Sequence, residues 1–277
     1  PKNGVCRLQE YCLKYDIKKS SYTRKSKIFD IDTSNNFYSF NPNRCILCRK
    51  CVRVCRELQG RDVLTASGRG VFTHIEPPFN TGLGNSRCVS CGNCISVCPV
   101  GALVPKRNIP FENDEIKKTR TTCVYCGVGC QMNLLTKGDK VVGTEPLDVV
   151  PNNGLLCVKG AFAYNFVNHK DRLKTPLIKK DGIFVESSFD EAIAFIAEKL
   201  TNIKKIYGRE SIAGLTSARC TNEENYLMQK FMRAVIGNNN IDHCARLCHA
   251  TTVSGLAETV GSGAMTNSIS EIEKADT

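Results

Sequence analysis

Cysteine is the residue type in this sequence with the most chemistry to offer, since 17 of the 277 residues are cysteines and most are closely spaced. One run has the spacing C-x2-C-x2-C-x3-C, and a second run repeats it. Thiolates this close together can bind iron–sulfur clusters or zinc, or they can pair as disulfides. An odd number of cysteines cannot all pair internally, and the clustering differs from that of scattered disulfides. The cysteines therefore point to metal chemistry.

The two repeated runs have the ligand spacing of bacterial two-cluster ferredoxins, in which three thiolates of one run bind a cluster and the fourth crosses to the other cluster. Structural zinc sites more often use two separated cysteine pairs. Pro99 follows the second run as in those ferredoxins, whereas Arg56 follows the first run. We predict two [4Fe–4S] clusters, whose ligand sets are Cys45, Cys48, Cys51, Cys98 and Cys88, Cys91, Cys94, Cys55.

A third set of cysteines has a different spacing. Cys123, Cys126 and Cys130 lie close together in the sequence, and Cys157 follows after a longer interval. By spacing alone this set could bind either zinc or a cluster. Several glycines, which let a backbone come close to a bulky inorganic group, lie beside these cysteines: Gly127, Gly129, Gly154 and Gly160.

The segments Cys123-Val-Tyr-Cys126-Gly-Val-Gly-Cys130 and Gly154-Leu-Leu-Cys157-Val-Lys159-Gly160 resemble the N-terminal [4Fe–4S] domain of molybdopterin oxidoreductases. The resemblance implies a third [4Fe–4S] cluster on these four cysteines. In that family, the lysine two places after the fourth cysteine lies between the cluster and the pterin. The resemblance therefore implies a cofactor-binding and catalytic position for Lys159.

The segment Ile241-Asp-His-Cys244-Ala-Arg-Leu-Cys248-His249-Ala resembles the active-site stretch of molybdenum- or tungsten-dependent formate dehydrogenases. The resemblance implies that Cys248 binds the metal and that His249 handles the proton released from formate. By itself a cysteine–histidine dipeptide would more simply be a buried structural pair. Thr251-Thr252 stands where a proline-containing pair is expected. Cys220 and Cys244 are expected to pack as small apolar residues.

The first residues, Asn3-Gly4-Val5-Cys6-Arg7-Leu8-Gln9-Glu10, resemble the end of a cluster motif with one histidine and three cysteines. That motif occurs in the large iron–sulfur subunit of NADH:quinone oxidoreductase and in formate dehydrogenase alpha subunits. Cys6 would be the last ligand of a further iron–sulfur cluster, which only the full-length protein could complete. We therefore expect an N-terminal fragment of a longer catalytic subunit, inactive by itself. Cys12 is expected to be a buried thiol.

The elements that must position these residues fall into four expected segments. Residues 1–43 would be the remnant of the histidine/cysteine domain with a connector, and 44–110 an α+β ferredoxin-like domain with two [4Fe–4S] clusters. Residues 117–175 would form a small, cysteine-rich, β-containing [4Fe–4S] domain. A polar linker over 106–122 would lead up to its first cysteine, Cys123. Residues 176–277 would be the truncated beginning of an α/β molybdopterin-binding domain.

Regular secondary structure is predicted most clearly in the last segment. The capping boxes Ser188-x-x-Glu191 and Thr221-x-x-Glu224 predict two helices that end near Gly208 and Gly237. The apolar run 211–215 predicts a buried strand between them. Helix, strand and helix in this order indicate a parallel sheet with helices on its faces.

Taken together, the motifs resemble a Mo/W-dependent formate dehydrogenase catalytic subunit. Bis-molybdopterin guanine dinucleotide would bind the metal in the full-length chain, and formate would be oxidised to CO2, or CO2 reduced. Electrons would pass through the clusters to a flavin- and NAD(P)-binding, ferredoxin or hydrogenase subunit. The alternatives are a non-catalytic electron-transfer subunit of an NADH:quinone-oxidoreductase-like complex and another molybdopterin enzyme such as a nitrate reductase.

Composition and charge exclude other classes of function. The formal charge is +11, and residues 18–27 are strongly basic, but aromatic residues are sparse there and no nucleic-acid recognition motif follows. No apolar run approaches the roughly 18 residues of a membrane span. Thiolates kept as iron ligands suit a reducing cytoplasm.

Overall fold

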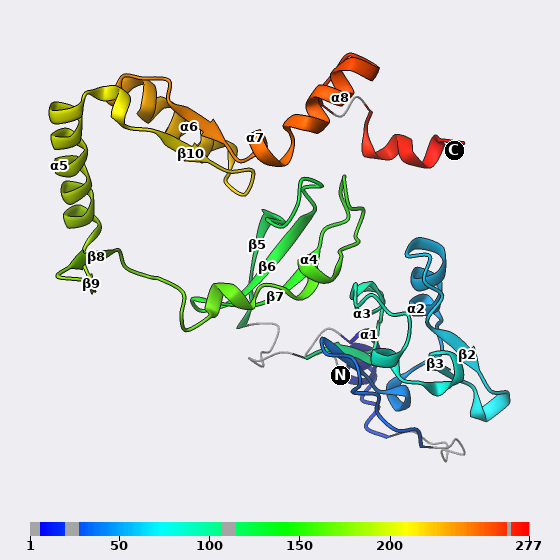
Figure 1. Ribbon diagram of the computed structural model, residues 1–277. Coiled ribbons are helices and arrows are strands. Elements are labelled where there is room, and N and C mark those ends of the chain that lie inside the picture. Colours follow the sequence, from blue (N-terminus) through cyan, green and yellow to red (C-terminus); the bar gives the residue numbers. More distant parts are fainter. Residues whose placement is uncertain (1–5, 20–27, 107–114, 265–266, 277) are drawn as a thin grey trace. The chain divides into compact units, whose positions relative to one another are not determined.

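The computed structural model describes residues 6–19, 28–106, 115–264 and 267–276 (Figure 1). It divides into two compact units, Pro1–Arg172 and Leu173–Thr277, and each unit is described by itself. A search of the described residues finds no helix with the length and apolar character needed to cross a membrane. Residues 20–27 of the basic run and residues 3–5 of the N-terminal motif lie outside the described part.

The ferredoxin-like part of the first unit is built from short strands and short helices. Two antiparallel pairs form, one between strands far apart in the sequence and one local. The first pair joins the beginning and the end of this region and so closes it around both cysteine runs. The strands are β1 (Tyr38–Phe40), β4 (Leu103–Pro105), β2 (Thr65–Ser67) and β3 (His74–Glu76).

Each cysteine run passes from a loop into a short helix. The first run enters α2 (Lys50–Arg53) and continues through a π-helical segment, Val54–Leu58. The second run enters α3 (Asn93–Ser96). Upstream of both runs, α1 (Arg7–Lys14) begins directly after Cys6.

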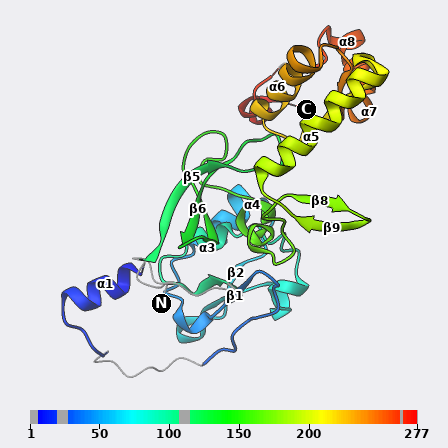
Figure 2. The ribbon, with the colours of Figure 1, turned by 90° about the vertical axis from the view of Figure 1, so that its left-hand side faces the viewer.

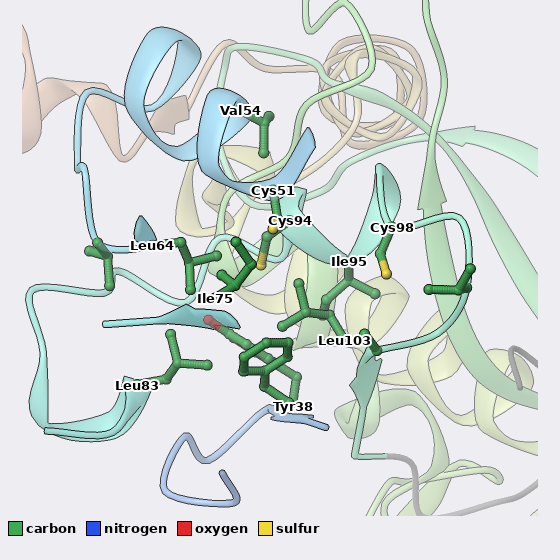
Figure 3. Close-up of a cluster of buried hydrophobic side chains, with 14 of the residues drawn as sticks. Tyr38, Cys51, Val54, Leu64, Ile75, Leu83, Cys94, Ile95, Cys98 and Leu103 are labelled. Carbon is green, nitrogen blue, oxygen red and sulfur yellow. The ribbon is translucent and has the colours of Figure 1, made fainter. Parts of the chain in front are cut away.

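Cysteines form part of the hydrophobic core of this region (Figure 3). The largest side chains with almost no exposure include Tyr38, Leu64 and Ile75. Cys51 and Cys94 are buried in the same cluster of side chains. The core that fixes the short elements therefore also fixes the thiols.

An antiparallel sheet of β5 (Lys117–Thr122), β6 (Gln131–Lys137) and β7 (Lys140–Pro146) follows. The expected polar linker is therefore wrong over 117–122, where the chain forms an edge strand. Its threonines favour extended backbone, and its lysines and arginine can remain in solvent at an edge. The short helix α4 (Val158–Phe162) begins after Cys157.

A buried amide joins the ferredoxin-like part to the part that contains this sheet. Asn93 is 1% exposed, and its Nδ2 donates to the Leu156 carbonyl oxygen over 3.1 Å, while the Leu156 N–H donates to Asn93 Oδ1 over 3.0 Å. Beside this pair, the Phe162 ring lies so close to Gly92 that a Cβ there would be 3.0 Å from it. Phe162 also stacks on Phe37, with 5.2 Å between the ring centroids. Polar and aromatic contacts thus lock this junction.

The second unit begins with a hairpin of β8 (Leu177–Lys180) and β9 (Ile183–Glu186), followed by the long helix α5 (Phe189–Tyr207) (Figure 2). The sequence analysis missed the hairpin. Its signal is the Asp181-Gly182 dipeptide between two apolar-containing runs, and both residues have positive φ, as a two-residue hairpin turn requires.

Both predicted helices of this unit are confirmed, together with their capping boxes. The helix α6 (Asn222–Lys230) continues as a π-helical segment up to Ile236 and ends at Gly237, as expected. The predicted strand is displaced, since β10 covers Gly214–Thr216 and residue 211 lies in a preceding turn. It pairs in parallel with β11 (Ile241–His243), which confirms the expected strand direction.

The last described elements are helical. They are α7 (Ala245–Cys248), α8 (Ala250–Val260) and a 3-10 segment, Ile269–Lys274. A small core of Ile212, Met232 and Ile236 packs under α6 and β10.

The N-cap of α5 generates a prediction about stability. Replacing Ser188 with alanine removes the hydroxyl that accepts the Glu191 N–H over 3.2 Å. We expect the free energy of unfolding to fall by about 1 kcal/mol, measured by urea denaturation followed by far-UV circular dichroism. Thr201→Ala, at an exposed position in the same helix, is the control. Equal losses in the two variants would contradict the capping role.

The Asn93 junction generates a second prediction. Asn93→Ala leaves the N–H and the carbonyl of Leu156 without their amide partners, and an unsatisfied buried group costs about 1–3 kcal/mol. We expect a loss of unfolding free energy of about 2 kcal/mol or more, measured by the same denaturation. Asn85→Ala removes an exposed amide that donates to the Thr81 carbonyl over 3.2 Å, and it should be nearly neutral. A neutral Asn93→Ala variant would show that the junction does not depend on the amide.

Candidate metal centres

The first predicted ligand set comes together around a cavity. Cys45, Cys48, Cys51 and Cys98 all line it. Burial, and then the charges of the other three thiols, raise the pKa of Cys51 to about 12. The pKa of Cys45 is also raised, mainly by burial. Four thiols that disfavour one another's charge are held together by the fold, as a binding site for a cationic iron core requires.

The second predicted ligand set lines a different cavity. Cys55 comes from the first run, and Cys88, Cys91 and Cys94 come from the second. Burial, followed by the charges of Cys91 and Cys88, raises the pKa of Cys94 well above its ordinary value. Cys51 of the first set is also among the thiols that raise it, so the two sets are neighbours.

The two runs use the same backbone device. Residues two and four places after the first cysteine have positive φ in both runs: Leu47 and Arg49 in one, Ser90 and Gly92 in the other. The Leu47 N–H donates to Cys45 Sγ over 3.3 Å, and the Ser90 N–H donates to Cys88 Sγ, also over 3.3 Å. Left-handed residues turn the chain back on itself. Each loop therefore wraps around its own cavity.

The donor atoms of the two sets are all sulfurs and surround cavities. Within the described ranges, no group of three His, Cys, Asp or Glu side chains converges closely enough to hold one ion. The thiols of the two sets instead surround cavities. Thiolates bound to the corners of a four-iron cube are farther apart than the ligands of one tetrahedral zinc ion. An all-sulfur donor set around a cavity is compatible with an iron–sulfur cluster.

One side chain near the second set was missed by the sequence analysis. Tyr38 is 1% exposed, and its hydroxyl lies 3.1 Å from Cys88 Sγ. Burial, first of all, raises the pKa of this phenol, and the adjacent Cys94 and Cys88 raise it further. The Asn35 amide, also buried, lies 4.0 Å from the same sulfur. No spacing rule marks either residue, because only the fold brings them beside the second run.

The third set also comes together. Burial raises the pKa of Cys130, and the charges of Cys123, Cys126 and Cys157 raise it further, in that order. The Cys123 N–H donates to the Cys130 carbonyl over 2.8 Å, and this bond closes the loop between them. At Gly160 a Cβ would lie 3.1 Å from Leu156 Cδ2 and 3.7 Å from Cys123 Sγ. Glycine is therefore needed there for the close approach of α4.

Lys159 lies on α4, two residues after Cys157, with an exposed side chain. Its ammonium group is 5.8 Å from the centroid of the Tyr125 ring, within the third cysteine loop. The Tyr125 hydroxyl hydrogen bonds to the Ala163 carbonyl at the other end of α4. Lys159 is thus adjacent to the third set, as a residue of the first unit.

Cys248 and His249 lie at the boundary between α7 and α8 in the second unit, and both are exposed. The helical hydrogen bond from the Cys248 N–H to the Cys244 carbonyl, 3.1 Å, fixes the backbone there. This segment follows directly after β11, whose carboxyl end lies beside that of its parallel partner β10. Ligand sites of parallel sheets are typically found at this edge.

The expected apolar packing of two other cysteines is wrong. Cys220 is exposed, and Cys244 is half-buried among polar groups. Cys244 Sγ lies 3.2 Å from the Ala218 N and 3.7 Å from Ser217 Oγ. Hydrogen bonds from these two groups lower the pKa of Cys244. Burial raises it, but by less. A thiol after one strand can accept a hydrogen bond from the turn that follows the neighbouring strand, which sequence patterns do not reveal.

The two N-terminal cysteines, Cys6 and Cys12, differ in their burial. Cys6 is buried before α1, and Cys12 is half-buried on α1 rather than fully buried as expected. Among the described residues, Cys6 belongs to no group of three or more His, Cys, Asp or Glu side chains that could hold a metal ion.

Three family models match the chain in succession. Residues 36–104 match the ferredoxin-like domain of NADH-quinone oxidoreductase subunit 3. Residues 116–169 match the molybdopterin oxidoreductase Fe4S4 domain, and residues 172–277 match molybdopterin oxidoreductase. The order of the iron–sulfur domains and the beginning of a molybdopterin domain agrees with the expected architecture.

Curated relatives match nearly the whole chain. Probable oxidoreductase YjgC of Bacillus subtilis strain 168 is 35% identical over 99% of this chain and 32% of its own length. Putative formate dehydrogenase SAV2309 of Staphylococcus aureus strain Mu50 is 33% identical over 99% of this chain and 32% of its own length. The chain thus spans about a third of the length of these relatives.

Two solved structures are also similar to parts of the chain. The crystal structure of an NAD+-reducing [NiFe]-hydrogenase in the H2-reduced state is 32% identical and covers 38% of this chain and 45% of its own, with a TM-score of 0.35. Acetylene hydratase from Pelobacter acetylenicus is 27% identical and covers 52% of this chain and 20% of its own, with a TM-score of 0.43.

Each of the three cysteine sets lies within the part of the chain that an iron–sulfur family model matches. Residues 116–277 belong to the molybdopterin oxidoreductase family, and an NADH-quinone-oxidoreductase-type ferredoxin-like domain precedes them.

Proposed function

We propose that this chain belongs to the catalytic subunit of a Mo/W-dependent formate dehydrogenase. It would contribute three [4Fe–4S] clusters and the beginning of the molybdopterin-binding domain. The observation that carries the proposal is the grouping of twelve cysteines in three sets of four, two of which surround cavities. The family matches and the relatives named as formate dehydrogenases support it.

The proposed domains follow the three sets. Residues 1–43 would be a histidine/cysteine domain remnant and connector, in which Cys6 ligates a further cluster in the full-length protein. Residues 44–110 would hold two clusters and residues 117–175 the third. Residues 176–277 would begin the α/β domain for the pterin cofactor. Cys51 and Cys94 lie in one buried cluster and interact electrostatically, and the Asn93–Leu156 hydrogen bonds join the second and third sets, so that the three sets would form one series.

Cys248 and His249 are the proposed catalytic pair. A molybdenum or tungsten ion in bis-molybdopterin guanine dinucleotide would, when bound, supply two-electron redox chemistry. Cys248 offers this ion a soft thiolate from an exposed position after α7. When formate becomes CO2 it loses one proton and two electrons. The His249 imidazole can accept that proton as a general base.

The clusters would carry the two electrons onward one at a time. Lys159 lies on α4 directly after Cys157, a place from which it can bind the pterin near the third cluster. The second and first sets would then pass electrons to a flavin- and NAD(P)-binding, ferredoxin or hydrogenase subunit. Cys48 of the first set is exposed, which suits an exit for electrons. Thiolates that remain iron ligands fit a reducing cytoplasm.

The second candidate is a non-catalytic electron-transfer subunit of an NADH:quinone-oxidoreductase-like complex. The match of residues 36–104 to a domain of that complex favours it. The Cys248-His249 pair favours the dehydrogenase, because a purely structural domain has no need of an exposed thiol beside an imidazole. Molybdenum and tungsten analysis of the whole protein decides, since absence of both metals contradicts the dehydrogenase.

Iron content tests the cluster assignment. After anaerobic purification the chain should contain about 12 iron atoms, or four per cluster. Cys123→Ser should lower this to about 8, because the third cluster is lost while the other two remain. Cys220→Ser, at an exposed cysteine outside all sets, should leave it unchanged. Zinc in place of iron, or equal iron in the two variants, would contradict the assignment.

Formate turnover tests the catalytic pair. In the whole protein, Cys248→Ser should reduce formate-dependent dye reduction to background, because serine replaces the soft thiolate by a hydroxyl. Iron content and the cluster EPR signals should not change. Cys220→Ser is again the matched control. Full formate-dependent activity of Cys248→Ser would contradict the role of Cys248. Nitrate consumption without formate oxidation by the unaltered protein would argue for another reaction.

A further inference from the structure

A buried hydroxyl touches the second cysteine set. Tyr38 lies on β1 in the ferredoxin-like core (Figure 3). Its hydroxyl oxygen is 3.1 Å from Cys88 Sγ. The charge of Cys94, in the same set, also acts on this hydroxyl. The ring is almost completely buried, at 1% exposure. A phenyl ring would fill the same space, so the packing alone does not explain the oxygen.

The direction of this hydrogen bond follows from the chemistry of the ligand. Two neutral groups could each donate, but a cysteine that binds iron does so as a thiolate and has no proton. The Tyr38 hydroxyl must then be the donor and Cys88 the acceptor. Hydrogen bonds to a charged acceptor are stronger than neutral ones. A buried hydroxyl also needs such a partner, because burying it without one is costly.

We propose that Tyr38 raises the reduction potential of the cluster on Cys55, Cys88, Cys91 and Cys94 by donating a hydrogen bond to Cys88. Reduction adds an electron to the cluster and increases the negative charge on its sulfurs. A donor at a ligand sulfur therefore stabilises the reduced state more than the oxidised state. This inference rests on the proposed cluster assignment, and it gives Tyr38 a tuning role within it.

The surrounding donors show what Tyr38 adds. The Ser90 N–H donates to Cys88 just as the Leu47 N–H donates to Cys45, so this backbone bond is common to both runs. The Tyr38 hydroxyl supplements the shared pattern at Cys88. Its neighbour Asn35 is held in place, since Nδ2 donates to Ser90 Oγ over 2.9 Å and Oδ1 accepts the Phe37 N–H over 2.9 Å. The strand that carries Tyr38 is thereby fixed against the cysteine loop.

The position of this cluster gives the tuning a consequence. The second set adjoins the first through Cys94 and Cys51, and it adjoins the third through Asn93 and Leu156. It is the middle member of the series. A higher reduction potential makes this cluster more readily reduced than the clusters on either side of it. Electron transfer is then affected in both directions along the series.

The test is an EPR-monitored redox titration of the anaerobically purified protein and of Tyr38→Phe. We expect the reduction equilibrium constant of one cluster to fall roughly tenfold, a shift of about 59 mV to lower potential for one electron. The other clusters should keep their potentials. Tyr164→Phe is the matched control, because its hydroxyl donates to the Val142 carbonyl over 3.0 Å instead of to a cysteine.

Site-specific replacement of Tyr38 by 3-fluorotyrosine provides the opposite change. The fluorinated phenol is a stronger donor, so the potential of the same cluster should rise. A merely structural role would not give shifts of opposite sign. This variant also decides the matter if Tyr38→Phe fails to assemble its cluster.

The outcomes separate the two proposals. If Tyr38→Phe and the 3-fluorotyrosine variant both keep the cluster potentials unchanged, with full iron content, the role of Tyr38 is overturned and the cluster assignment stays intact. A protein without [4Fe–4S] signals overturns the assignment and the role of Tyr38 together. Equal shifts in Tyr38→Phe and Tyr164→Phe also overturn the specific role.

Discussion

Repulsion between buried thiolates is the constraint on which the rest of the first unit depends. Burial and neighbouring sulfurs both raise the thiol pKa values, so four thiolates do not gather without a compensating cation. The chain must therefore hold them by its backbone. Left-handed residues at Leu47, Arg49, Ser90 and Gly92 achieve this in each ferredoxin-type run. Helices and strands are short here because the loops occupy most of the chain.

Cysteine spacing and capping boxes were sufficient to predict much of the architecture. The cysteines fall into the sets that their spacing suggests, although ligand binding itself stays a prediction, and both boxed helices begin where expected. These signals are local, and local geometry largely fixes their outcome. The parallel direction of β10 and β11 also followed from the order of the elements.

What sequence reasoning missed depends on contacts between distant segments. Asn93 meets Leu156, and Tyr38 meets Cys88, across intervals that no motif spans. The polar residues of β5 resemble a linker until a partner strand pairs with them. The polar surroundings of Cys244 come from the turn that follows β10. The Asp181-Gly182 turn, in contrast, was readable and was overlooked.

Cysteines also take the place of some aliphatic side chains in the hydrophobic core of the ferredoxin-like region. Cys51, Cys94 and Cys98 are buried there beside aliphatic side chains. The sulfurs of these proposed ligands also form part of the hydrophobic core. If they bind iron, the free energy of metal binding contributes directly to the free energy of folding. Loss of iron from the proposed clusters would therefore remove redox centres and weaken the hydrophobic core of this region at the same time.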